Sequence, residues 1–207
     1  FELIKLYKIS KLINGPISKK YFLRKKFPGI TEYVGFKTNT KDPVMLIYNK
    51  NFSVVPLTTH IPLKNVVKFI KKKVIINKVI KVDSFYKSKL KKIPKIAILG
   101  LNPHCETTDK ISEEKNEIIP AINFLKNKKI KIYGPFSADT FFLKKNIKKF
   151  DVVIGMYHDQ VLTPIKTLFE FKAINITIGL PFIKVTPDHG PNEKMMGKNI
   201  SDPSSII

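Results

Sequence analysis

Short apolar runs and amphipathic segments alternate along the second half of the chain. Four apolar runs predict strands, at residues 95–101, 129–133, 151–156 and 173–178. Ser112 and Ser137 are candidate N-caps, and the residues behind them predict helices over residues 112–126 and 137–146. Because strands that alternate with helices usually pair in parallel, the pattern predicts an α/β fold with a largely parallel sheet flanked by helices.

The first half has a less regular pattern. Residues 64–92 predict two basic amphipathic helices with a break near Val82 and Asp83, and residues 44–55 predict one or two strands. No internal repeat is visible, so we expect one globular piece with two approximate lobes, 1–94 and 95–207.

Composition places the protein among soluble globular chains. Its 207 residues are 43% hydrophobic, which is enough to bury a substantial core. Lysines recur every few positions, so no run approaches the roughly 20 apolar residues of a membrane-spanning helix. Residues 1–13 lack a secretory cleavage site, and the single cysteine, Cys105, cannot form an internal disulfide. We expect a cytoplasmic protein that does not bind a membrane.

The net charge is +22, but this large positive charge does not by itself indicate a nucleic-acid partner. Clustered basic residues usually indicate nucleic acid. Here the basic residues are lysines apart from Arg24, and they are dispersed among many Ile, Asn and Phe residues, as AT-rich codon usage would produce. We therefore expect no nucleic-acid partner, and a basic surface that favours an anionic small substrate. A nucleic-acid-binding module with a decayed enzyme sequence stays as an alternative of another class.

All four histidines lie beside turn residues at the ends of predicted elements: His60, His104, His158 and His189. In open α/β folds ligands bind beyond the carboxyl ends of strands, where His104 and His158 directly follow their apolar runs. Histidine is the commonest metal ligand, and imidazoles that leave coordination positions open would let a cation polarise a substrate oxygen. A single such histidine is usually an ordinary loop residue, but four together favour a site. The spacing does not tell which of them bind.

Other chemistry has weaker support. Cys105 adjoins His104, but there is no G-x-S-x-G elbow for a nucleophile. Neither a G-x-G-x-x-G nor a Walker sequence is present, so a nucleotide cofactor would bind in another way. Lys166 and Lys184, with Asn175 between them, could hold a phosphate or carboxylate group.

Eight collinear motifs carry a resemblance over nearly the whole chain. They are NGPISK (14–19), FPGITE (27–32), TTHIPL (58–63), GLNPH (100–104), GPFSADT (134–140), MYHDQ (156–160), NITIGLPF (175–182) and DHG (188–190). In this order they resemble the 4-hydroxythreonine-4-phosphate dehydrogenase family of vitamin B6 biosynthesis.

The resemblance implies a fold like the isopropylmalate and isocitrate dehydrogenases, with the active site in an interdomain cleft shared by a homodimer. It implies NAD and one divalent cation (Zn, Mg or Co), and oxidation with decarboxylation of 4-phosphooxy-L-threonine to 3-amino-2-oxopropyl phosphate. By matching position it implies metal ligands at His60, His104 and His158, and substrate contacts at Thr31, Lys166, Asn175 and Lys184, with Lys166 also catalytic. His189 is not a ligand in this scheme.

Departures from the family keep alternatives open. Ile30 stands where the family usually has His, and Lys184 where it usually has Arg, which loses a bidentate fork. Residues 105–109 replace a Gly-rich segment, residues 191–194 also differ, and family members are longer at both ends, so the chain is expected to be a fragment. One alternative is a sister dehydrogenase acting on 4-phospho-threonate or 4-phospho-erythronate. Another is an inactive truncated dehydrogenase.

Overall fold

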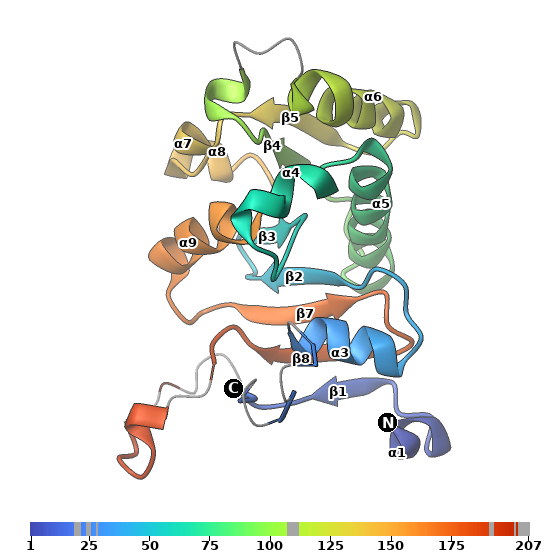
Figure 1. Ribbon diagram of the computed structural model, residues 1–207, viewed down its shortest axis with the longest axis vertical. Helices are drawn as coiled ribbons and strands as arrows, with labels where there is room; N and C mark the ends of the chain where they lie inside the picture. The colour runs from blue at the N-terminus through green and yellow to red at the C-terminus, as the bar shows by residue number, and fades with distance from the viewer. Residues whose placement is uncertain are drawn as a thin grey trace. The chain divides into compact units, whose positions relative to one another are not determined.

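The computed structural model describes residues 1–18, 22–23, 26–27, 29–106, 112–190, 193–200 and 202 (Figure 1). Several positions used above lie outside the described residues: Lys19, Arg24, Pro28, 107–109 and 191–192. The chain forms two compact units. The first unit comprises Phe1–Asn49 and Leu168–Ile207, and the second comprises Lys50–Thr167. The expected boundary near residue 94 falls inside the second unit.

The second unit contains a parallel sheet. Its strands are β3 (Ser53–Pro56), β6 (Val152–Gly155), β4 (Ile96–Leu99) and β5 (Ile132–Phe136), in that order across the sheet. Every residue of β3, β6 and β4 is buried. Continuous apolar strands of this kind require cover on both faces, as the sequence predicted.

Helices supply that cover. The longer helices of this unit are α5 (Lys72–Lys89), α6 (Ile119–Asn127) and α9, which begins here and spans His158–Phe169. The shorter elements are η1 (Leu63–Asn65), α4 (Val66–Phe69), η2 (Pro103–Cys105), the π-helical turn η3 (Glu114–Ile118), α7 (Ala138–Phe141) and α8 (Lys144–Ile147). In Figure 1, α5 lies on one side of these strands, and α7, α8 and α9 lie on the other.

Two predicted helix boundaries differ from the structure. The expected break near Val82 and Asp83 is wrong, because both residues are buried inside the single helix α5. The helix expected over residues 137–146 is interrupted, since α7 ends at Phe141 and α8 begins only at Lys144. The helix expected over residues 112–126 is present, with η3 as its first turn.

The first unit has a mixed sheet. Its strands, in order, are β1 (Lys11–Ile13), β8 (Ile183–Pro187), β7 (Ile174–Ile178) and β2 (Val44–Tyr48). β1 and β8 are parallel, whereas β7 runs antiparallel to both β8 and β2. The helical elements are α1 (Glu2–Leu6), α3 (Ile30–Lys37) and η4 (Glu193–Met195). No helix among the described residues combines the length and apolar composition that crossing a bilayer requires.

Candidate metal and substrate site

The strand order of the second unit places three histidines along one edge of its sheet. His60 follows β3, His158 follows β6 as the first residue of α9, and His104 follows β4 within η2. The three strands are parallel and β6 lies between the other two, so their carboxyl ends share one edge. Adjacent strands are about 4.8 Å apart. His158 is therefore expected between His60 and His104, within side-chain reach of both.

His60 and His158 are brought together. Their ring centroids are 5.7 Å apart, and both side chains are half-buried. The His158 Nδ1 lies 2.6 Å from Asp159 Oδ1, so the carboxylate can fix the ring tautomer and leave Nε2 for a ligand. Two neighbouring imidazoles are chemically suited to a divalent cation such as Zn²⁺ or Co²⁺.

His104 is not brought into the same cluster. It adopts a left-handed backbone conformation (φ 55°), and its side chain is 75% exposed. Its Nδ1 lies 3.9 Å from Asp139 Oδ2, beyond hydrogen-bonding distance. Within the part of the chain that the structure describes, no three His, Cys, Asp or Glu side chains are grouped closely enough to hold a metal ion. The three-histidine site therefore stays a prediction.

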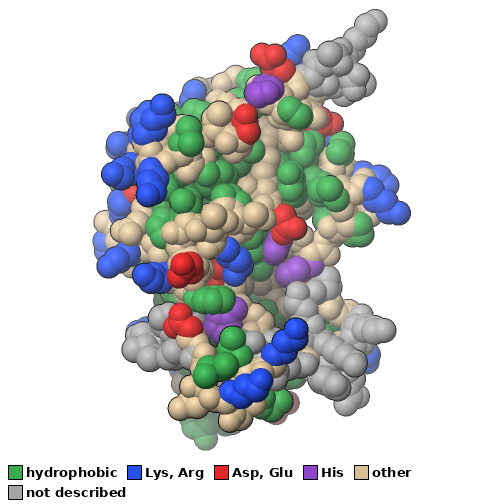
Figure 2. All heavy atoms as spheres, turned by 90° about the vertical axis from the view of Figure 1, so that its left-hand side faces the viewer, with side chains coloured by type: hydrophobic (Ala, Val, Ile, Leu, Met, Phe, Trp, Pro, Cys, Tyr) green, Lys and Arg blue, Asp and Glu red, His purple; other side chains and the backbone are tan. Residues whose placement is uncertain are grey.

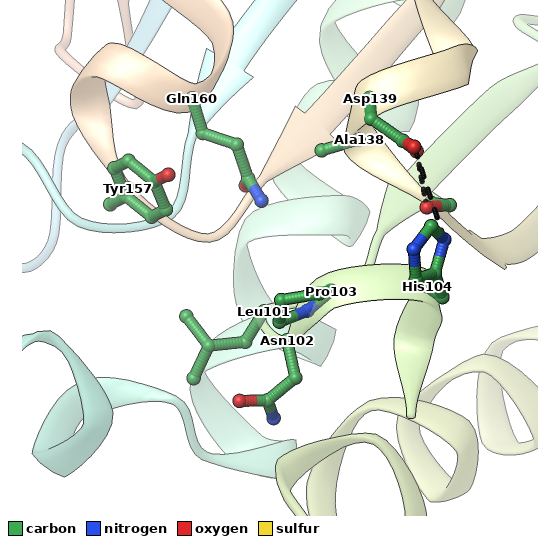
Figure 3. A pocket seen from close by; sticks show the side chains of 9 residues that line it. Leu101, Asn102, Pro103, His104, Ala138, Asp139, Tyr157 and Gln160 are labelled. Atoms are coloured by element: carbon green, nitrogen blue, oxygen red, sulfur yellow. Dashed lines mark hydrogen bonds and ion pairs between the residues drawn. The ribbon is translucent and has the colours of Figure 1, made fainter. Parts of the chain in front are cut away.

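A pocket of about 380 Å³ adjoins His104 (Figure 3). It is lined by Leu101, Asn102, Pro103, His104, Ser137, Ala138, Asp139, Tyr157 and Gln160. These residues come from the segments that follow β4, β5 and β6. Figure 3 shows His104 and Asp139 facing each other at one side of the pocket, with Tyr157 and Gln160 at another. The mixture of hydroxyl, amide, imidazole and carboxylate groups suits a polar ligand.

A buried carboxylate holds the loop that carries His104. Glu114 is 1% exposed, and its Oε1 accepts hydrogen bonds from the backbone N–H groups of Leu101 (2.8 Å) and Asn102 (2.9 Å). Its Oε2 accepts from Asn102 Nδ2 (2.9 Å) and Ser112 Oγ (2.8 Å). Burial alone would raise the pKa of Glu114, but the hydrogen bonds from Asn102 and Ser112 outweigh it and lower that pKa to about 2. The sequence did not single out Glu114, which looked like an ordinary acidic residue in a first helical turn.

Lys166 lies in the last turn of α9 and is half-buried. It lies eight positions after His158 in the same helix, or about 12 Å along the axis. It therefore belongs to the same unit as the three candidate ligands without adjoining His158. Its catalytic role stays a prediction.

The remaining substrate candidates belong to the first unit. Thr31 is in α3, Asn175 in β7 and Lys184 in β8, and all three are buried. Lys184 pairs with Thr177 across the antiparallel ladder, and Asn175 is two residues before Thr177. Cross-strand partners and residues two apart in a strand share a face, so these three side chains line one face of the sheet.

Several buried polar atoms of these residues have no partner within the described chain. On this face they are Asn175 Oδ1, Thr177 Oγ1 and Lys184 Nζ, and in α3 it is Thr31 Oγ1; none makes a hydrogen bond to another described residue. Because an unpaired buried polar group costs free energy, such a cluster indicates water or a ligand. Burial lowers the pKa of Lys184 from 10.5 to about 8. Thr177 was missed from sequence, although polar residues at alternate positions of an apolar strand were a visible signal.

His189 belongs to the first unit, and its ring contacts Phe171 with centroids 5.7 Å apart. Its Nδ1 lies 3.1 Å from the carbonyl oxygen of Gly190.

Known structures share this fold. A solved isocitrate dehydrogenase from Methylococcus capsulatus superposes with a TM-score of 0.60 at 11% identity, covering 99% of this chain and 67% of that one. This likeness confirms the predicted dehydrogenase-like fold. A structure described as a putative 4-hydroxythreonine-4-phosphate dehydrogenase from Salmonella typhimurium superposes better, with a TM-score of 0.81 at 30% identity, covering 99% of this chain and 64% of that one.

Sequence relatives agree with the structural ones. A 4-hydroxythreonine-4-phosphate dehydrogenase from Sulfurihydrogenibium sp. (strain YO3AOP1) is 46% identical over 204 residues, which cover 97% of this chain and 63% of the relative. The chain thus spans less than two thirds of that protein's length. The family model described as "Pyridoxal phosphate biosynthetic protein PdxA" matches residues 1–207. The chain belongs to the PdxA family of pyridoxal phosphate biosynthetic proteins.

Proposed function

We propose that the protein is a 4-hydroxythreonine-4-phosphate dehydrogenase of vitamin B6 biosynthesis. It would oxidise 4-phosphooxy-L-threonine with NAD and a divalent cation, and the β-keto acid formed would lose CO₂ to give 3-amino-2-oxopropyl phosphate. The observation that carries the proposal is the placement of three histidines at the carboxyl ends of adjacent parallel strands, with two rings side by side, in a member of this family.

The chain's own residues would divide the work. His60, His104 and His158 would hold the cation, and Asp159 would orient the His158 ring. A divalent cation held there would supply Lewis acidity for a substrate oxygen, and NAD would supply an acceptor for the hydride of the hydroxyl-bearing carbon. The hydroxyl proton would leave to a base. When the bond between the carboxyl carbon and the neighbouring carbon breaks to release CO₂, its electron pair would remain on that neighbouring carbon until the carbon is protonated.

The anionic ends of the substrate would bind elsewhere. The candidate contacts are the Lys184 ammonium, the Asn175 amide and the Thr31 hydroxyl. Three of their buried atoms have no described partner, namely Lys184 Nζ, Asn175 Oδ1 and Thr31 Oγ1. A phosphate or carboxylate oxygen would satisfy the ammonium and hydroxyl groups. The Lys166 ammonium is the remaining candidate for holding an anionic group or transferring a proton.

Metal content and NAD reduction test the proposal directly. We expect the wild-type protein to reduce NAD with 4-phosphooxy-L-threonine only when metal is present. His60→Ala, His104→Ala and His158→Ala should each lose metal binding and activity, whereas His189→Ala, the matched control, should keep both. Metal binding that persists in the three variants would contradict the assignment.

A sister activity is favoured by one part of the site. Lys184 lacks the planar fork of the family's usual Arg, and Ile30, the first residue of α3, cannot hydrogen bond to a substrate through its side chain. A dehydrogenase acting on 4-phospho-threonate or 4-phospho-erythronate would need no contact to an amino group. Running the same assay with these acids separates the two, and turnover of them alone would replace the leading proposal.

We also propose that the protein is a homodimer with a shared active site. Sedimentation of the protein would then give twice the mass of one chain.

Figure 2 shows basic side chains spread over the displayed face in several groups, with acidic ones among them. A nucleic-acid surface would instead concentrate them in one patch or stripe. On the displayed face, this dispersion does not favour a nucleic-acid-binding module.

A further inference from the structure

Four polar side chains lie on one face of the ladder between β7 and β8, two strands that run side by side in the first unit (Figure 1). Thr177 stands opposite Lys184, and Asn175 stands opposite Thr186. Residues that pair across a ladder, or lie two apart in a strand, share a face of the sheet. All four side chains are buried, and Thr177 (2% exposed) and Lys184 (0%) are the most deeply buried of them.

The neighbouring strands give Thr177 and Lys184 no hydrogen-bonding side chain on this face. On the β2 side, the residue opposite Thr177 is Met45. On the β1 side, the residue beside Lys184 is Leu12. Thr177 Oγ1 and Lys184 Nζ make no hydrogen bond to any described residue, and none to each other. The register of the sheet therefore places a hydroxyl and an ammonium group together and leaves both without a described partner.

Thr186 shows that burial on this face does not by itself leave a hydroxyl unpaired. Its side chain is 7% exposed, and its Oγ1 donates to the carbonyl oxygen of Pro187 (2.8 Å). Thr177 is the more deeply buried of the two threonines, yet its hydroxyl has no such bond to the described chain. Because an unpaired buried hydroxyl costs free energy, the Thr177 hydroxyl is available to a ligand.

The charge of Lys184 indicates an anionic ligand. A buried ammonium group is destabilised unless an opposite charge compensates it. Among the described residues no carboxylate pairs with Lys184, and burial alone lowers its pKa, to about 8. Water would supply a hydrogen bond but no charge. An oxyanion would accept hydrogen bonds from the ammonium and from a neighbouring hydroxyl group, and would also compensate the charge.

We propose that Thr177 is a further substrate-binding residue, whose hydroxyl donates to the same oxyanion as the Lys184 ammonium. That oxyanion is the phosphate group of the substrate, an identity that rests on the proposed function. Asn175 Oδ1, an unpaired acceptor on the same face, would take a hydrogen bond from a hydroxyl or amino group of the same ligand. The face would then recognise an anionic group together with a neighbouring donor.

The test compares two buried threonines on the same face. Thr177→Val removes the hydroxyl and keeps a branched side chain that suits a strand. Thr186→Val is the matched control, because it makes the same change where the hydroxyl already bonds within the chain. Thr177→Ser keeps a hydroxyl at the tested position. The dissociation constant of inorganic phosphate is measured by calorimetry without NAD or added metal, with acetate as the comparison, and the thermal midpoint of each unliganded protein is recorded.

We expect Thr177→Val to bind phosphate roughly 10-fold more weakly, and Thr177→Ser and Thr186→Val to bind it as wild type does. Unliganded Thr177→Val should keep or raise the thermal midpoint, because it removes a hydroxyl without a partner, whereas Thr186→Val should lower it. A merely structural role for the Thr177 hydroxyl would give the opposite result, a lower midpoint with unchanged phosphate affinity.

Two sets of outcomes separate this inference from the proposed function. Equal phosphate affinity in Thr177→Val and wild type, no phosphate binding by wild type, or tighter binding of acetate would overturn the inference. NAD reduction with 4-phosphooxy-L-threonine would then still uphold the proposed function. Phosphate binding that depends on Thr177, in a protein that fails to reduce NAD with that substrate, would support the inference and overturn the proposed function.

Discussion

At the scale of single residues, Lys184 places a charged side chain in the interior of the first unit, where burial destabilises its ammonium form. Its side chain is fully buried, and its Nζ has no partner among the described residues. The resemblance supplied its candidate role, but the sequence alone could not show its burial, which depends on tertiary packing. Thr177, directly across the ladder, was missed because a threonine in a strand is common.

Lys184 should make stability depend on alkaline pH. Burial lowers its pKa from 10.5 to about 8, so between these values the unfolded chain binds a proton that the folded chain has lost. Stability attributable to this group therefore rises with pH across that window, and the buried ammonium destabilises fully below it. Lys184→Met should raise the free energy of unfolding at pH 7 by about 2 kcal/mol and flatten this rise.

Urea unfolding between pH 7 and pH 10 checks the prediction. Lys11→Met, which removes an exposed lysine from β1, is the control and should follow wild type. The assignment of a destabilising buried cation fails if the two methionine variants show the same pH dependence.

At the scale of elements, the sequence predicts well those strands and helices that depend on the local pattern of apolar residues. The buried strands β4 and β6 are continuous apolar runs, and both were predicted within a few residues of their ends. Helix α9 was missed, because Pro164 interrupts its pattern and its first residues look like a turn. The antiparallel direction of β7 follows from its pairing with β2, which lies far away in sequence.

Glu114 holds the turn η3 and the loop of His104 together, and low pH should weaken this connection by protonating the carboxylate. Hydrogen bonds hold the pKa of Glu114 at about 2 despite burial, against an ordinary 4.5. A carboxylate with a lowered pKa contributes stability that is complete above pH 4.5 and is lost as pH falls towards 2. Glu114→Gln should lower the free energy of unfolding at pH 7 by about 2 kcal/mol and weaken its dependence on pH below 4.5.

The neighbouring Glu113 provides the comparison. It is half-buried and accepts only the Asn102 Nδ2 hydrogen bond (3.0 Å) among the bonds described for it, so Glu113→Gln should change little. Chemical unfolding at pH 3, 5 and 7 distinguishes the two. An unchanged acid slope in Glu114→Gln would mean that another carboxylate controls acid stability.

At the scale of the whole molecule, the sequence could not reveal the discontinuous first unit. That unit joins residues 1–49 to residues 168–207, because β7 and β8 pair with β2 and β1. A boundary drawn from sequence order, near residue 94, cannot represent a unit whose two segments are separated by the other unit. The three histidine-bearing loops belong to one unit with a regular parallel sheet, so their placement at one end of that sheet follows from the order of its strands, whereas the metal site itself stays a prediction.

The net charge of +22 leads to the last prediction. If the lysines act as a diffuse surface, nucleic acid should bind weakly and lose that binding steeply with salt, because released counterions are its only source of affinity. We expect retention on an immobilised DNA or RNA column in 20 mM salt and near-zero retention at about 150 mM. The three histidine-to-alanine variants should elute as wild type does. Retention of the wild type at physiological salt would mean that the lysines form a built binding surface, and the nucleic-acid alternative would return.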